Sequence, residues 1–321
     1  MGNVATLTDN RQNENCWLVA GGLDKQMNTV PALKQGNKLR ATDQILAFLQ
    51  CQNKIEESLG RLNLRGVKLD RFAGWHFRDR LQDGSLGPVM NIIPGGRFLM
   101  GSPASEAERR DNERQHEVEV ASFAIGKYAV TFEEYDRFAE ATGRGKLKDE
   151  GWGRWRHPVI NVTWNDAVAY ADWLSALTGK AYRLPTEAEW EFACRADTTT
   201  PFHFGATIST ELANYNGKYT YGNGKKGIYR VKTLEVGQFP ANAWGLHDMH
   251  GNVWEWTASV YDEQYGGAER QASATYAAGS RVVRGGSWVN IPQYLRSAYR
   301  GRDSTGDVYF QGFRLARALS L

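Results

Sequence analysis

Residues 281–317 of this chain read RVVRGGSWVNIPQYLRSAYRGRDSTGDVYFQGFRLAR. The two ends of the stretch, 281–288 and 312–316, alternate apolar with polar or basic residues and are bounded by glycines, which predicts two strands of one sheet. The residues between them have neither helical nor strand periodicity and are rich in tyrosine, arginine and aspartate. Such side chains on a rigid frame offer large contact area and adaptable hydrogen bonds. The stretch is therefore typical of a recognition surface.

The middle of the stretch carries the candidate ligand-binding residues. We predict a surface formed by Val289, Ile291, Tyr294, Tyr299, Gly301, Arg302, Asp303, Asp307, Val308, Tyr309 and Phe310. An exposed cluster of this make-up has the composition of a binding hot spot. For any single residue, packing against the sheet edge or solvation of the charge is an equally good interpretation, but for the set we favour a surface. A framework role, bonding loop carbonyls and carboxylates, is assigned to Arg284, Arg296, Arg300 and Arg314.

Composition favours an ordinary globular protein and argues against several classes of partner. The 321 residues are 41% hydrophobic, and 39 basic against 36 acidic residues leave a formal charge of +3. This balance gives no electrostatic case for nucleic acid as a partner. No apolar run is long enough to insert into a membrane, and the polar start of the chain lacks the core of a signal peptide. Cysteines Cys16, Cys51 and Cys194 are few and far apart, which fits free thiols in the cytoplasm.

The sequence divides into two parts near the turn-rich residues 83–88. Residues 1–85 are expected to form a partly helical N-terminal segment of unknown role. Within it we predict one helix over about 42–59, and a short helix or docking loop at 70–77. Residues 86–321 form the main domain.

The main domain begins with strands and continues with helices. Strand patterns occupy 91–102, interrupted by a Pro-Gly-Gly turn, and 116–123, with a solvated loop expected at 106–114. Helices are predicted after threonine N-caps that are followed three positions later by an acidic residue, namely Thr131, Thr163 and Thr186. Glycine, asparagine and tyrosine then dominate, as in ordered loops. Helices early and strands late indicate an α+β fold.

Several stretches resemble the formylglycine-generating-enzyme (sulfatase-modifying factor) family, a variant of the C-type lectin fold. They are GRFLMGS at 96–102, AVT at 129–131, PV at 158–159, RLPTEAEWE at 183–191, GNVWEW at 251–256, RGGSW at 284–288 and GFR at 312–314. These motifs occur in the family's order over about residues 90–317. The resemblance implies a loop-rich C-type lectin fold of the formylglycine-generating type for residues 86–321.

The family's oxidase activity depends on copper held by two cysteines just after the Gly-Gly-Ser strand. In that interval this chain has no cysteine and carries Pro292, Leu295 and Ser297. A hydroxyl or apolar side chain cannot replace a thiolate as a ligand of Cu(I). Cys194, in the predicted helix after Thr186, is interpreted as a buried structural cysteine. We therefore expect no catalysis, with a formylglycine-generating-type or related metal-dependent oxidase as the disfavoured alternative.

A second enzymatic branch is similar to the sulfoxide synthases of ergothioneine biosynthesis, which bind iron through three histidines. Residues 1–90 of this chain hold only His76, so the resemblance does not extend to that iron site. His247 and His250 could share a metal, but histidines packed in loops are commoner than ligands. No cofactor is therefore required.

The C-terminal stretch also resembles the variable proteins of diversity-generating retroelements. In that family, fixed framework residues alternate with codons, usually AAC or AAT, that mutate at adenines and so exclude Lys, Glu, Gln, Met and Trp. None of the candidate surface residues is of an excluded type, whereas Gln293 and Gln311 do not fit such an origin. The resemblance implies a non-catalytic protein with a variable region at about 281–317. Its partner would be a protein or cell-surface ligand specific to this variant, and its location cytoplasmic or phage-associated.

The loop at 248–255 resembles a Ca2+ site of the formylglycine-generating family. The candidate ligands are Asp248, Glu255 and the backbone carbonyls of Gly251 and Val253. Hard oxygen ligands on a tight turn suit Ca2+. The alternative, that Glu255 caps backbone N–H groups without a metal, is equally good. A structural Ca2+ is thus the only ion that the resemblance suggests.

Overall fold

The computed structural model describes residues 5–7, 16–20, 74–273, 279–306 and 310–319. The predicted helix over 42–59 and the candidate residues Asp307, Val308 and Tyr309 lie outside this part. The elements are β1 (Ala5–Leu7), β2 (Cys16–Ala20), β3 (Trp75–Phe77), β4 (Met90–Ile93), β5 (Gly96–Met100), β6 (His116–Val120), β7 (Phe123–Gly126), α3 (Phe132–Thr142), α4 (Trp164–Thr178), β8 (Tyr182–Arg183), α5 (Glu187–Arg195), β9 (Trp254–Val260), η2 (Ala268–Arg270), β10 (Arg281–Arg284), η3 (Pro292–Leu295), β11 (Gly301–Asp303), β12 (Gln311–Phe313) and β13 (Ala316–Ala318).

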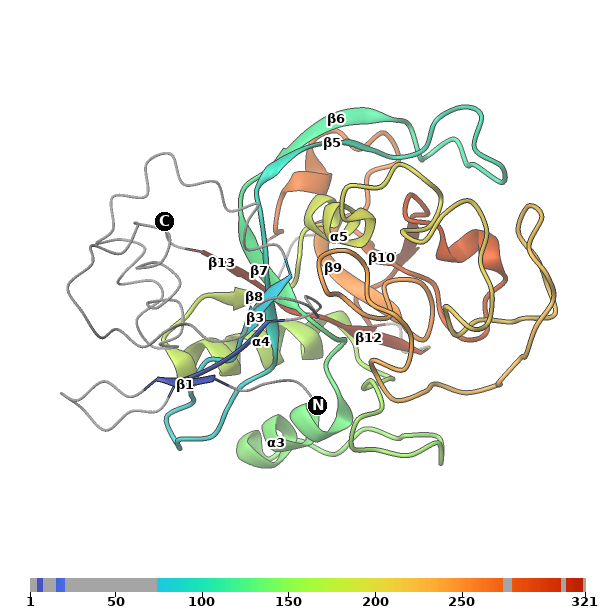
Figure 1. Ribbon diagram of the computed structural model, residues 1–321. Coiled ribbons are helices and arrows are strands. Elements are labelled where there is room, and N and C mark those ends of the chain that lie inside the picture. Colours follow the sequence, from blue (N-terminus) through green and yellow to red (C-terminus); the bar gives the residue numbers. More distant parts are fainter. Residues whose placement is uncertain (1–4, 8–15, 21–73, 274–278, 307–309, 320–321) are drawn as a thin grey trace.

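Two sheets, built from strands far apart in sequence, form the body of the molecule (Figure 1). In the larger sheet the described strands follow the order β1-β2-β3-β4-β7-β13-β8. In the smaller sheet the order is β11-β10-β9-β12, with β10 antiparallel and β12 parallel to β9. A separate hairpin of β5 and β6 arches over the top of the view. Helices together with sheets that are mainly antiparallel confirm the α+β class.

The two predicted strands that frame residues 281–317 share one sheet only in part. β10 and β12 both bond to β9, where Val283 and Phe313 each lie opposite Trp256. Ala316, in contrast, pairs with Ile125 of β7 in the larger sheet. The prediction was right for Phe313 and wrong for Ala316, because the chain passes between the two sheets after Phe313.

The larger sheet also crosses the predicted boundary at 83–88. Residues 75–77, expected in a short helix or docking loop, form β3, in which His76 lies opposite Asn91 of β4 and Val19 of β2. Strand formation depends on partners that a local pattern does not contain, which explains the wrong prediction. Strands from before the boundary thus belong to the same sheet as the main domain.

Threonine N-caps begin the three described α-helices, as the sequence predicts. Thr131 accepts a hydrogen bond from the backbone N–H of Glu134, whose carboxylate accepts from the backbone N–H of Thr131. Thr163 and Thr186 cap α4 and α5 through the N–H three residues on. At the other end of α3, Gly143 adopts the left-handed conformation that glycine favours.

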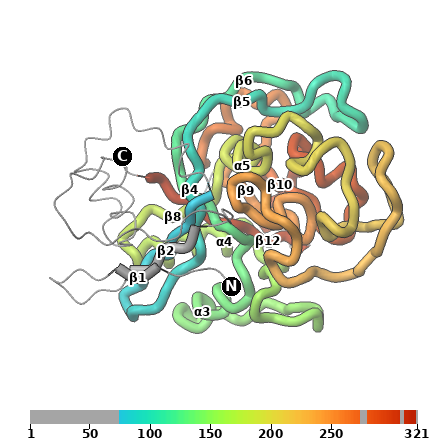
Figure 2. Tube along the Cα trace, in the orientation of Figure 1, coloured from blue at the N-terminus to red at the C-terminus, as the bar shows by residue number. Residues whose placement is uncertain are grey.

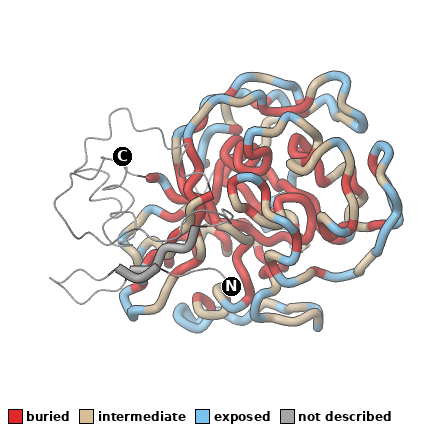
Figure 3. The backbone as a smooth tube through the Cα atoms, viewed as in Figure 1, coloured by how far each residue is buried: buried red, intermediate tan, exposed pale blue. Residues whose placement is uncertain are grey.

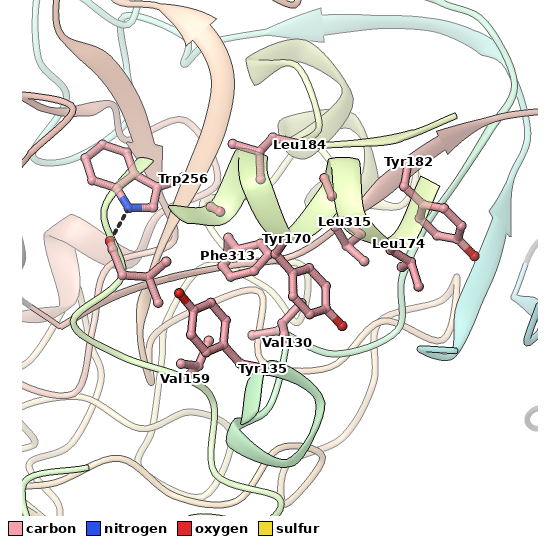
Figure 4. Packing of buried hydrophobic residues seen from close by; sticks show 14 of the residues in the cluster. Val130, Tyr135, Val159, Tyr170, Leu174, Tyr182, Leu184, Trp256, Phe313 and Leu315 are labelled. Carbon is pink, nitrogen blue, oxygen red and sulfur yellow. Dashed lines mark hydrogen bonds between the residues drawn. The ribbon is translucent and has the colours of Figure 1, made fainter. Parts of the chain in front are cut away.

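Buried residues gather in the centre of the molecule, red in Figure 3, and form a hydrophobic core to which both helices and strands contribute. In Figure 4, the indole of Trp256 points toward the backbone carbonyl of Val162, to which its Nε1 donates at 2.8 Å. Phe313 packs edge-on against Tyr170 of α4, with ring centroids 5.4 Å apart. Long loops between α5 and β9, yellow to orange in Figure 2, surround the smaller sheet. The core therefore fixes β10 and β12, the two ends of the candidate recognition stretch.

Candidate functional site

Residues 281–317 are called the recognition stretch below. Two of its arginines are buried and form paired hydrogen bonds with carboxylates. Arg314 donates from Nε and Nη2 to the two oxygens of Glu255, both at 2.6 Å. Arg300 holds Glu187 in the same way, at 2.6 and 2.9 Å. Two parallel bonds between a guanidinium and a carboxylate fix the geometry of both groups.

A third arginine, Arg284, forms a buried ion pair with Glu191 of α5. Although burial by itself would raise the pKa of Glu191, the cations of Arg195 and Arg284 hold it below its ordinary value. Arg284 also donates to the backbone carbonyl of Tyr299 and so ties the recognition stretch to the core.

The fourth arginine, Arg296, reaches the loop at 106–114, which is mostly solvated as predicted but contains the buried Glu113. Arg296 donates to both oxygens of Glu113, each at 2.7 Å, and to Glu106 at 2.7 Å. Glu113 is fully buried. Burial raises the pKa of Glu106, and Arg296 opposes that shift. The charged loop is therefore a partner of the recognition stretch. The predicted framework role is confirmed, at no more than 2% exposure, for Arg284, Arg296, Arg300 and Arg314.

An open hollow of about 510 Å3 lies beside β11 of the smaller sheet. Four predicted surface residues line it together, Tyr299, Gly301, Arg302 and Asp303. Its remaining lining comprises Arg110, Asp111, Asn112, Trp254, Tyr261, Glu263, Val283 and Arg300. Sequence reasoning did not select these, because most lie outside the recognition stretch and reach the hollow only through the fold.

Arg110 and the ring of Tyr299 form one side of the hollow. Tyr294 meets Tyr299 edge-on, with centroids 4.8 Å apart. Arg110 lies over both rings, 5.3 Å from that of Tyr294 and 4.8 Å from that of Tyr299. Tyr299 is only 5% exposed, which differs from the displayed side chain that we predicted. Its burial raises the pKa of its hydroxyl. Tyr299 thus lines the hollow as a buried base, and the half-buried Tyr294 packs against it without lining the hollow itself.

The other side of the hollow is held by hydrogen bonds to the 106–114 loop. The side chain of Asn112 donates to the hydroxyl of Tyr261 at 2.7 Å. The backbone carbonyl of Asn112 accepts from Arg300 at 3.0 Å. The exposed Arg302 lies over the Tyr261 ring at 5.0 Å. These contacts set the positions of the framework residues around the candidate surface residues.

The structure does not bring every described candidate to the hollow. Val289 is 38% exposed and Ile291 is half-buried, and neither lines the hollow. Phe310 packs on Trp288 and Trp152, with centroids 5.0 and 5.6 Å away. The recognition stretch therefore also contributes to an aromatic cluster away from the hollow.

The proposed calcium ligands have partners of their own. Glu255 binds Arg314 and accepts from Nε1 of Trp190 at 2.6 Å. The carbonyl of Gly251 accepts from the N–H of Val253 at 2.9 Å. Asp248 accepts from Gly237 through one oxygen, its other oxygen has no partner among the described residues, and burial raises its pKa to about 6. These contacts favour a structural role for Glu255, and calcium at this loop stays a prediction.

The interval that carries cysteines in the oxidase branch lies beside a buried thiol. Cys194 is fully buried, as predicted, and its Sγ lies 3.7 Å from Oγ of Ser297. Its Sγ is also 3.6 Å from Nε2 of His250. Burial raises the pKa of the Cys194 thiol to about 12. A thiol held in the neutral form is a poor nucleophile and a poor metal ligand.

His247 and His250, considered above as metal ligands, each contact a backbone carbonyl. His247 contacts the carbonyl of Phe239 at 2.8 Å, and His250 that of Leu295 at 2.6 Å. Among the described residues, no group of three or more His, Cys, Asp or Glu side chains is arranged to hold a metal ion. Nor does that part contain a helix long and apolar enough to cross a membrane.

Known proteins are similar in sequence to this chain over most of its length. The family described as "Sulfatase-modifying factor enzyme 1-like domain" matches residues 80–319. The chain is 35% identical over 257 residues to the serine/threonine-protein kinase pkn1 of Chlamydia caviae, covering 72% of this chain and 38% of that protein. It therefore spans less than half the length of that relative. It is also 30% identical over 270 residues to the formylglycine-generating enzyme of Mycobacterium tuberculosis, covering 63% of this chain and 87% of that protein.

Solved structures share the fold. PvdO from Pseudomonas aeruginosa superposes with a TM-score of 0.65 and 35% identity, covering 77% of this chain and 99% of that chain. Treponema denticola variable protein 1 superposes with a TM-score of 0.54 and 24% identity, covering 72% and 95%, a likeness of fold alone. The architecture is thus the C-type-lectin-like one that the sequence motifs imply. The chain belongs to the sulfatase-modifying factor enzyme 1-like family.

Proposed function

We propose that this chain is a non-catalytic ligand-binding protein whose hollow beside β11 is a diversified recognition surface. The observation that carries the proposal is the difference in burial along residues 299–303, all of which line the hollow. Tyr299 and Arg300 are buried, and Arg300 binds Glu187, whereas Arg302 is exposed. Side chains that carry the fold and a side chain that can face a ligand thus occur within one short segment.

Such an arrangement suits a surface whose residues change. A scaffold tolerates variation when its stability comes from residues other than the variable ones. Here the buried arginines bind acidic partners from the 106–114 loop, from α5 and from β9, none of which lies in the variable region. Exchange of Arg302 or Asp303 leaves those ion pairs intact. The shared fold of a variable protein from Treponema denticola supports the same interpretation.

The partner that we propose is a protein or cell-surface ligand specific to this variant. The hollow combines aromatic rings, arginine and short polar side chains, the composition of protein-binding hot spots. Its volume falls in the range of about 300–1,000 Å3 that is usual for small binding sites. A segment of a partner is therefore a better fit than a broad flat surface.

The test is the DNA downstream of the gene. We expect a near-copy of the codons for residues 281–317 that differs almost only where the copy has adenine, beside a reverse transcriptase gene. Substitutions across related isolates should fall on codons such as those of Tyr294, Arg302 and Asp303 and spare those of Arg300 and Arg314. Absence of the repeat, with substitutions spread evenly, would reject diversification.

An oxidase of the formylglycine-generating type is the second candidate, favoured by the relative that carries that name. The residues argue against it, because Leu295 and Ser297 occupy the interval of the cysteines and the nearby Cys194 thiol is buried. We expect no oxygen consumption when the protein is supplied with Cu(I) and a peptide with a sulfatase-type cysteine motif. Copper-dependent turnover of that peptide would restore the enzymatic function.

A further inference from the structure

The hollow is bordered by the free edge of a sheet. In the order β11-β10-β9-β12, β11 pairs with β10 on one side and with no described strand on the other. Edge strands present backbone N–H and C=O groups that can pair with another chain. Gly301, Arg302 and Asp303, the whole of β11, line the hollow.

The hydrogen bonds of β10 show which groups of β11 point outward. The carbonyl of Ser280 accepts from Tyr261 N–H at 2.8 Å, and that of Val282 accepts from Thr257 Oγ1 at 3.0 Å, so both face the β9 side. The backbone N–H and C=O groups of successive residues point to opposite sides of a strand, so those of Arg281 and Val283 face β11. Their partners are Asp303 and Gly301. The N–H and C=O of Arg302 therefore point away from the sheet.

The hollow follows this edge on both faces of β11. On one face, a Cβ at Gly301 would meet the side chains of Val283 and Trp254, at 2.8 and 3.3 Å. On the other face, Arg302 lies over Tyr261. Since lining residues come from both faces, the hollow includes the edge itself. No described residue bonds the outward peptide groups of Arg302.

We propose that the ligand presents an extended peptide segment that adds to β11 as a further strand, pairing with the N–H and C=O of Arg302. This inference rests on the proposed function and names the form of its ligand. Backbone pairing is the part of recognition that does not change when side chains vary, and flanking side chains supply specificity. The peptide's side chains would alternate between the face of Trp254 and Val283 and the face of Arg302 and Tyr261.

The wall formed by framework residues suits such a strand. Asn112 is tied to both Arg300 and Tyr261, none of which is a candidate variable residue. A preorganised groove lowers the entropy cost of ordering a peptide. The groove keeps this shape whichever residue stands at position 302, because these contacts do not involve its side chain.

The experiment uses the full chain and a phage-displayed library of random linear peptides as probe. Selected peptides are resynthesised with a single N-methyl group at each backbone position in turn. Strand addition predicts period-two sensitivity, in which methylation at alternate positions weakens binding by about tenfold or more, since a hydrogen bond is lost and the strands are pushed apart. A profile without this alternation overturns the proposal.

A pair of variants at one position supplies the second measurement. Arg302→Pro removes the outward N–H, and proline is tolerated where the N–H of an edge strand faces solvent. Arg302→Ala removes the same side chain and keeps that N–H. We expect the peptides to bind Arg302→Pro about tenfold more weakly than Arg302→Ala. If Arg302→Pro does not fold, the N-methyl profile decides alone.

The outcomes separate this inference from the proposed function. Peptides that lose affinity for Asp303→Ala, yet show a flat N-methyl profile and no difference between the two Arg302 variants, overturn strand addition and leave a binding hollow. Recovery of no peptide that depends on the hollow also overturns strand addition. The downstream DNA repeat, which involves no peptide, then judges the proposed function by itself.

Discussion

Arg300 and Arg302 lie two residues apart in one segment, but Arg300 is buried and Arg302 is exposed. Arg300 is 2% exposed, and its Nε and Nη2 both donate to Glu187. Arg302 is exposed, and its described contact is with the ring of Tyr261. Removing one member of a buried ion pair strands the other charge in the interior, whereas an exposed cation is solvated with or without its neighbour. The same residue type therefore stabilises the fold at one position and remains available to a ligand at the other.

The largest expected loss of stability concerns the buried pair of Arg314 and Glu255. We expect Arg314→Met to lower the free energy of unfolding by about 3–5 kcal/mol, because Glu255 is left without its counter-ion. The matched control, Arg302→Met, should change it by no more than about 0.5 kcal/mol. Urea unfolding at neutral pH measures both. Similar losses in the two variants would contradict the division of roles.

Two aromatic residues, one buried and one half-buried, should differ in the same way in their contribution to stability. Phe313 is fully buried against Tyr170, so Phe313→Ala should cost about 3–5 kcal/mol of unfolding free energy. Tyr294 is half-buried beside Tyr299, so Tyr294→Ala should cost about 1 kcal/mol or less. Thermal and urea unfolding of the two variants provide the measurement. A larger loss for Tyr294 would assign that ring to the scaffold instead of the surface.

Acid should act on the scaffold and not on the hollow. Burial lowers the pKa of His203 from 6.5 to about 4, and its Nδ1 has no partner among the described residues. The unfolded chain binds a proton near pH 6.5 and the folded chain resists it, so stability present above pH 6.5 is lost as pH falls toward 4. The loss from this side chain is on the order of 2–3 kcal/mol.

His203→Phe should remove that share of the acid sensitivity, because phenylalanine keeps a ring beside His250 and does not titrate. Urea unfolding between pH 7.5 and pH 4.5, compared with the unchanged chain, is the measurement. If both proteins lose the same stability over this range, His203 is not the group responsible.

The smallest expected effect concerns calcium. Arg314 already neutralises Glu255, so we expect Ca2+ to leave the melting temperature of the protein unchanged. Asp248→Asn is the matched variant, since it removes the carboxylate with an unpartnered oxygen. Calcium that raises the melting temperature of the unchanged chain, but not of Asp248→Asn, would support the predicted site.

The elements that sequence reasoning predicted correctly are those with local causes. The N-caps at Thr131, Thr163 and Thr186 depend on residues three positions away, and so the start of each described α-helix follows from the sequence. The strand at 75–77 and the split after Phe313 depend on partner strands far along the chain, which explains why both were missed. The burial of Glu113 in the otherwise solvated 106–114 loop was missed for the same reason, because its partner Arg296 lies far along the chain.

The candidate site shows the same division. The sequence identified Tyr299, Gly301, Arg302 and Asp303 as surface candidates, and they line one hollow. It did not identify Arg110 or Tyr261, because no periodicity links them to the stretch at 299–303. It also treated Tyr299 as displayed, whereas contacts with Tyr294 and Arg110 bury it.

By itself the sequence determined the fold class, the family, the helix starts and the framework role of the arginines. These follow from local capping, from motif order and from the cost of burying an arginine without a partner. Only the tertiary structure decided which carboxylate each arginine binds, that a distant loop completes the hollow, and that the peptide groups of Arg302 face outward. Such features depend on contacts between residues far apart in the chain, and no local pattern encodes which residues those are.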